Sequence, residues 1–66
     1  MVDPTYHDSS AEIRARAATA ATRLEGIAKG TGPLDYLDTL ASLGLVEHEL
    51  EIAASLCRQQ LRAAPK

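Results

Sequence analysis

The chain has 66 residues, a formal net charge of −2 and one cysteine, and these features exclude several classes of protein. A lone cysteine cannot form a disulfide within the chain, and the slight acidic excess is unlike the basic balance of most nucleic-acid-binding domains. No apolar run approaches the roughly 20 residues needed to cross a bilayer. A domain this short buries only about 60% of its unfolded surface. We therefore expect oligomerisation or partner binding to supply stability that a lone core would lack.

The first eight residues are polar and include Pro4. Because proline disfavours helix at the residue before it, we expect a flexible arm over 1–8, one helical domain over 9–64 and a short tail at 65–66. The polar start is unlike a signal peptide, and a free cysteine suits a reducing compartment, so a cytoplasmic location is expected. The preference for arginine and alanine points to a bacterial or phage genome.

A long helix is predicted over residues 10–29. Ser9 and Glu12 have the spacing of a capping box, Glu12 and Arg16 form a favourable i,i+4 pair, and Gly30 suits the position after the last turn. Apolar residues recur at helical spacing on the face expected to pack in the core: Ile13, Ala17, Ala20, Leu24 and Ile27. The opposite face is a strip of small residues, either a plain exposed surface or a secondary interface: Ala15, Thr19, Thr22 and Gly26.

Glycine and proline divide the rest of the chain. The glycines and proline of residues 30–33 predict a hinge, followed by a short helix over 33–43. Gly44 suits the left-handed residue that ends a helix, so another long helix is predicted over 45–64. The expected fold is all-α, with a long, a short and a long helix. The two long helices are expected to form an antiparallel hairpin that dimerisation completes.

The helix predicted over 45–64 carries apolar residues around about half of its circumference, in two neighbouring stripes. One stripe is expected to hold the fold: Val46, Leu50, Ala53, Cys57 and Leu61. The other stripe exceeds what a small core needs, and we interpret it, together with Gln59, as an interface. Its residues are Leu45, Ile52, Leu56, Gln59 and Ala63.

No pattern in the sequence predicts a catalytic, cofactor-binding or metal site. His48 with Glu47 or Glu51 offers two metal ligands at helical spacing, but no third ligand is recognisable. Cys57 lies among apolar residues, where a thiol is a poor nucleophile. We therefore expect no enzymatic activity, no cofactor and no small-molecule substrate.

The predicted function is that of a small non-enzymatic protein-protein interaction module, an adaptor, inhibitor or assembly factor. Its partners would be a second copy and a second protein. One alternative is a nucleic-acid-associated regulator that pairs arginine clusters on a dimer, although the acids Glu47, Glu49 and Glu51 would repel phosphate. A second alternative is a structural component of a phage or bacterial assembly. The arginines in question are Arg14, Arg16, Arg23, Arg58 and Arg62.

Overall fold

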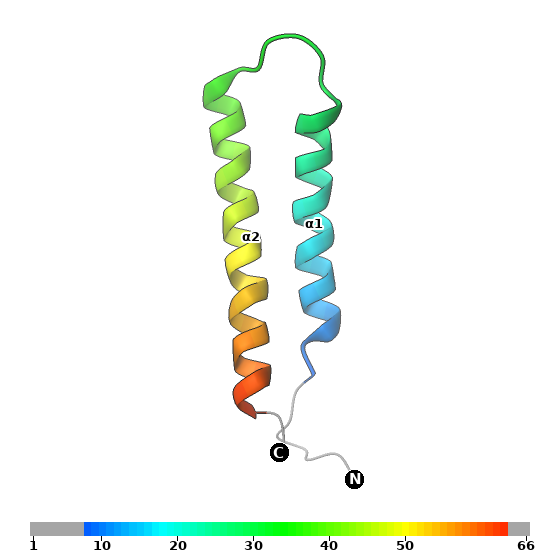
Figure 1. The fold of residues 1–66 in the computed structure, drawn as a ribbon, viewed down its shortest axis with the longest axis vertical. Helices are drawn as coiled ribbons and strands as arrows, with labels where there is room; N and C mark the ends of the chain where they lie inside the picture. Colours follow the sequence, from blue (N-terminus) through cyan, green and yellow to red (C-terminus); the bar gives the residue numbers. More distant parts are fainter. Residues whose placement is uncertain (1–7, 64–66) are drawn as a thin grey trace.

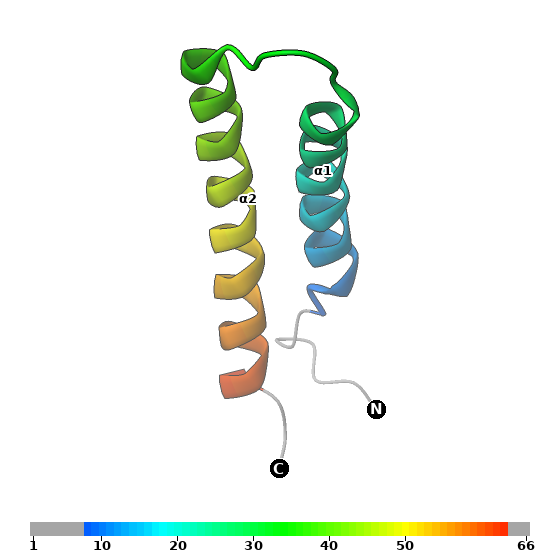
Figure 2. The same ribbon diagram turned by 45° about the horizontal axis from the view of Figure 1, so that its top comes forward.

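The computed structural model describes residues 8–63, and over this range the chain is an antiparallel hairpin of two helices (Figure 1). Helix α1 spans Ser10–Lys29 and helix α2 spans Tyr36–Ala63. The helices lie side by side in both views, joined by one connection at the same end (Figure 2). The all-α class and the hairpin are therefore confirmed, whereas the three-helix arrangement is wrong. The predicted tail and all but the last residue of the predicted arm lie outside the described residues.

Helix α1 begins and ends as the sequence predicted, but its N-terminus is capped differently. Ser9 occupies the N-cap position without a side-chain capping hydrogen bond, so the capping-box interpretation is wrong. Asp8 supplies the acceptor instead: its Oδ1 accepts hydrogen bonds from the Ser10 N–H at 3.0 Å and the Ser10 hydroxyl at 2.7 Å. A carboxylate is favourable there because the N-terminus is the positive end of the helix dipole. Glu12 is consequently left to make its predicted pair with Arg16.

Asp35 sets the start of α2. Its Oδ1 accepts hydrogen bonds from the N–H groups of Leu37 and Asp38, both at 3.1 Å, which is the geometry of an N-cap side chain. The helix therefore begins at Tyr36. The position of the proline had predicted a start at Pro33, which is wrong. The connection before it includes Gly32, whose φ of 83° lies in the left-handed region that favours glycine.

Helix α2 continues without a break through Gly44, where the sequence predicted a helix end. Gly32 is the glycine with positive φ among residues 8–63, so Gly44 does not adopt the left-handed conformation. A glycine inside a helix costs only about 1 kcal/mol relative to alanine. Ending the helix there would leave several carbonyls and amides at two new helix ends in need of partners. Continuity is thus the less costly solution, and it merges the second and third predicted helices into one.

The hairpin buries very little apolar surface. Among the described residues the buried hydrophobic side chains are Ala20 and Val46, which expose 3% and 4%. Of the stripe expected to hold the fold, Leu50 and Leu61 expose 50% and 80%, and Cys57 is also exposed. The predicted core is therefore right for Val46 and wrong for these three residues. The helix over residues 10–29 was expected to pack on this stripe, but α1 covers only Val46 and, in part, Ala53.

Replacing Gly44 by alanine tests the continuity of α2. A Cβ at Gly44 would meet nothing within 4 Å. We expect Gly44→Ala to raise the free energy of unfolding by about 1 kcal/mol, because alanine is the better helix former. Gly32→Ala is the matched control, and it should lower stability by about 1–2 kcal/mol because of its left-handed backbone. Urea unfolding followed by circular dichroism measures both, and destabilisation by Gly44→Ala would contradict the continuous helix.

Candidate interaction surfaces

The two helices meet at positions that recur in alternating steps of four and three residues, the spacing of a coiled coil. We call these positions the inner seam, and each of them is buried or half-buried. In the first half of the hairpin they are the N-cap residue Ser9 and, on α1, Ile13, Arg16, Ala20 and, one heptad later, Ile27; on α2 they are Thr39, Ser42, Val46, Glu49, Ala53, Leu56 and Gln60. Most of these side chains are small or polar. The contact between the helices therefore buries less apolar area than a leucine-rich seam of the same length would.

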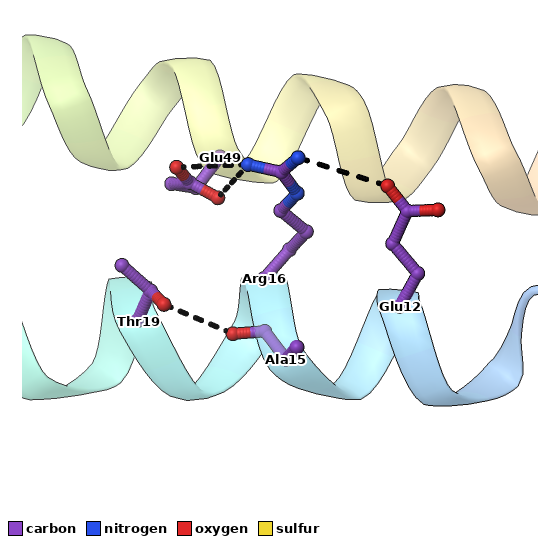
Figure 3. A network of polar contacts seen from close by, with 5 residues as sticks. All are labelled: Glu12, Ala15, Arg16, Thr19 and Glu49. Carbon is purple, nitrogen blue, oxygen red and sulfur yellow. Dashed lines mark hydrogen bonds and ion pairs between the residues drawn. The ribbon is translucent and has the colours of Figure 1, made fainter.

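An ion pair crosses the middle of the inner seam (Figure 3). Arg16 on α1 donates from Nη1 to both carboxylate oxygens of Glu49 on α2, at 3.3 Å and 3.1 Å, and its Nη2 lies 3.6 Å from Glu12. The Glu49 side chain is only 17% exposed. The hydrogen bond and the charge of Glu49 raise the pKa of Arg16, so this guanidinium stays charged throughout the ordinary pH range. A half-buried charged pair in a seam favours the one alignment of the helices in which both charges meet.

The interface residues predicted from the sequence share one face of the hairpin. Thr19 precedes the buried Ala20 by one residue, and Leu45 precedes the buried Val46 by one residue. Each step along a helix rotates the side chain by about 100° about the helix axis. In two antiparallel helices, residues at the same sequence offset from the buried contact residues therefore lie on the same side of the pair. The primary set of Leu45, Ile52, Leu56, Gln59 and Ala63 therefore lies on the same side of the hairpin as the strip of Ala15, Thr19, Thr22 and Gly26. We call this side the small-residue face.

The threonines of the small-residue face direct their hydroxyls into the helix. The hydroxyl of Thr19 donates to the carbonyl of Ala15 at 3.1 Å, and that of Thr22 donates to the carbonyl of Ala18 at 3.0 Å. Figure 3 shows the first of these bonds. Because the hydroxyls already have acceptors, this part of α1 can approach another backbone without leaving them unpaired. Gly26 continues the strip with open space where a Cβ would lie.

Helix α2 carries an open hollow of about 310 Å³ at the edge of the small-residue face. Three of the predicted interface residues line it, Ile52, Leu56 and Gln59, and the other lining residues are His48, Glu51 and Ser55. Ile52 and Leu56 are half-buried and Gln59 is exposed. His48 and Glu51 have no third metal-binding partner, since no group of three His, Cys, Asp or Glu side chains gathers within residues 8–63. The hollow is an open depression in the surface of α2.

The exposed leucines of α2 form a second coiled-coil repeat that sequence reasoning missed. Steps of four and three residues run unbroken along α2 through eight positions, seven of them apolar: Tyr36, Leu40, Leu43, Glu47, Leu50, Ala54, Cys57 and Leu61. We call these positions the outer seam. Every one of them except the half-buried Ala54 is exposed. The signal was present in the sequence, but the repeat crosses Gly44, and dividing the helix at that glycine concealed it.

The outer seam lies on the side of the hairpin opposite to the small-residue face. Leu50 follows the buried Val46 by four residues, and Leu24 follows the buried Ala20 by four, so both turn in the same sense from the inner seam. Leu24 is exposed, and α1 presents further alanines on that side at Ala17, Ala21 and Ala28. The hairpin thus has an apolar surface on each side of its inner seam.

No family model, no curated protein and no solved structure matches this chain. Within the described residues, neither helix is both long enough and apolar enough to span a membrane.

Exchanging the charges of Arg16 and Glu49 tests whether their pair aligns the helices. Arg16→Glu would bring a third carboxylate beside Glu12 and Glu49, and Glu49→Arg would bring two guanidinium groups together, so each single change should lower the midpoint of urea unfolding. The double variant should recover most of the loss, because the pair is restored with its charges exchanged.

The exposed pair of Arg58 and Glu51 on α2, 2.8 Å apart, provides the matched control. Exchanging the charges of Arg58 and Glu51 should change the free energy of unfolding by no more than about 0.5 kcal/mol, as is usual for exposed ion pairs. Additive effects of Arg16→Glu and Glu49→Arg would show that the two residues do not act as a pair.

Proposed function

We propose that this chain is a small non-enzymatic protein-interaction module, an adaptor, inhibitor or assembly factor that works through helix faces. The observation that carries the proposal is the surplus of exposed apolar side chains. Two buried hydrophobic residues, Ala20 and Val46, stand against nine large hydrophobic side chains that are exposed within the described part of the chain. Extended apolar surface on a soluble domain marks an interaction site, because leaving it in water is unfavourable. The partners proposed are a second copy and a second protein.

The small-residue face is the proposed site for the second protein. Its α1 strip allows close approach of a backbone, and its α2 side offers Ile52 and Leu56 beside the hollow. This combination fits an amphipathic helix of a partner, which would place one large apolar side chain in the hollow and a small-residue surface against α1. Gln59 and Glu51 at the hollow offer polar groups that can orient such a helix.

The alternative of a nucleic-acid-associated regulator has less support. Of the five arginines that such a role would use, Arg16 is paired with Glu49 and Arg58 with Glu51. A guanidinium held by a carboxylate contributes little net charge toward a phosphate backbone. A structural role in a larger assembly uses the same protein-binding surfaces and differs from the adaptor role mainly in stoichiometry.

A bulky charged residue in the small-residue strip tests the proposed function. Gly26→Arg projects into open space and replaces a poor helix former, so we expect helix stability to be kept or raised while the face is blocked. Ala18→Arg is the matched control, because Ala18 is exposed on the outer side of α1, away from α2.

The measurement is affinity capture from an extract of the native host with tagged wild-type chain and both variants. Wild type and Ala18→Arg should retain a protein other than the chain itself, and Gly26→Arg should retain at least an order of magnitude less of it. Equal retention by all three, or none by wild type, would remove the small-residue face as the partner site.

A further inference from the structure

We infer that the outer seam binds the outer seam of a second copy of this chain, with the two α2 helices antiparallel, so that two hairpins form a four-helix bundle. The inference rests on the proposed interaction-module function and names the partner of one of its two faces. Sequence reasoning expected dimerisation through Ile52 and Leu56. The structure assigns self-association to the opposite side, at Leu43, Leu50 and Leu61.

The exposed apolar side chains of the described residues gather on the outer seam. Of the nine large hydrophobic side chains that are exposed, five belong to it: Tyr36, Leu40, Leu43, Leu50 and Leu61. Large apolar side chains in a continuous row are typical of the buried centre of a homodimer interface.

The outer seam has the length and composition of a dimer seam. From Tyr36 to Leu61 it runs for about 38 Å along one helix without interruption. Seven apolar residues at eight coiled-coil positions exceed the content of the inner seam of α2, where Val46, Ala53 and Leu56 are the apolar members. The stronger of the two repeats on α2 is thus the one that the hairpin leaves uncovered. A straight apolar surface of this kind is matched by another straight helix with the same repeat, which a second copy supplies.

Charge decides the direction of the second copy. Glu47 is the one charged residue in the outer seam, and Glu51 lies beside it, whereas Arg58 and Arg62 follow toward the end of α2. Parallel α2 helices in equal register would bring Glu47 against Glu47 of the second copy, two like charges in an apolar seam. Antiparallel helices in the register that places Glu47 level with Cys57 of the second copy bring Glu47 beside Arg58 of that copy, and the outer seams then overlap from Leu43 to Leu61. The charge pattern therefore favours the antiparallel arrangement, related by a two-fold axis.

Helix α1 allows the bundle to close. Leu24, Ala17 and Ala21 lie on the same side of the hairpin as the outer seam, and the alanines leave room for a neighbouring helix. Each α2 would then contact α1 of its own chain through the inner seam and α2 of the second copy through the outer seam. This is the packing expected of a four-helix bundle, in which each helix buries two adjacent stripes.

Sedimentation equilibrium of the purified chain tests the inference directly. Wild type should sediment as a dimer at micromolar concentration, and Leu50→Glu should shift it to monomer by placing two carboxylates in the seam. Leu37→Glu is the matched control, because Leu37 is exposed on α2 outside both seams and its change should leave the dimer intact. A monomeric wild type at high micromolar concentration, or a dimer unaffected by Leu50→Glu, would overturn the inference.

Cys57 provides a second measurement that needs no variant. Its thiol is exposed in the hairpin, whereas its outer-seam position would be covered in the dimer. Alkylation of Cys57 in wild type should therefore slow by an order of magnitude as the protein concentration rises through the dimerisation range. A rate independent of concentration would contradict burial of this seam. Mild oxidation reports the direction, since parallel helices would align the two Cys57 thiols and give rapid disulfide formation, whereas antiparallel helices separate them.

The outcomes separate this inference from the proposed function. A purified monomer that still captures a host protein in a manner sensitive to Gly26→Arg would overturn self-association and leave the interaction module standing. A dimer that captures no other protein would support self-association and remove the second-protein site. A monomer without capture would overturn both.

Discussion

Two helices can bury only one stripe of each other, and this geometric limit governs the molecule. A helix in a hairpin has a single neighbour, so apolar residues outside the contact stripe stay in water. Here α2 has apolar residues on both sides of its contact with α1, and the contact itself is made largely of small and polar side chains. The large apolar side chains of α2 therefore lie mostly outside the inner seam, which is the contact between α1 and α2. This mismatch between the position of the apolar residues and the position of the contact is the basis of the interaction surfaces.

The charged pair at the centre of the inner seam has a role that leucine could not fill. An apolar seam of alternating steps can slip by one heptad without losing its pattern, because equivalent positions look alike. Arg16 can meet Glu49 in one alignment of the helices, so the pair distinguishes that alignment from its neighbours. A pair of this kind adds little stability for its burial. Its contribution is to define which residues of α1 and α2 lie opposite each other, and hence which faces the hairpin presents.

Sequence reasoning predicted the features that depend on local chemistry and missed those that depend on choosing a partner surface. The bounds of α1, the hinge at residues 30–33 and the hairpin followed from periodicity and helix-breaking residues. The prediction at Gly44 was wrong because glycine is compatible both with a helix end and with a helix interior. The free-energy cost of creating two new helix ends cannot be read from the residue at that position. The predicted contact face of α2 was also wrong: Leu50 and Leu61 were expected to pack against the first helix, and they are exposed. The grouping of Ala15, Thr19, Leu45 and Ile52 on one face depended on which residues of each helix face the other helix, and no single helix encodes that choice.

The distribution of apolar residues also bears on how the chain folds. A hairpin held by a seam of mainly small and polar residues gains little from hydrophobic burial, while ordering its residues costs about 1–2 kcal/mol of backbone entropy each. Covering the outer seam with a second copy, as proposed, would add favourable burial without ordering further backbone. Folding and association would then be linked, and the stability of the hairpin would depend on protein concentration. In the dimer that we propose, Leu50 and Leu61 would stabilise the fold through the second copy, although they are exposed in the single chain. The stripe predicted to be the core would then be divided between two molecules.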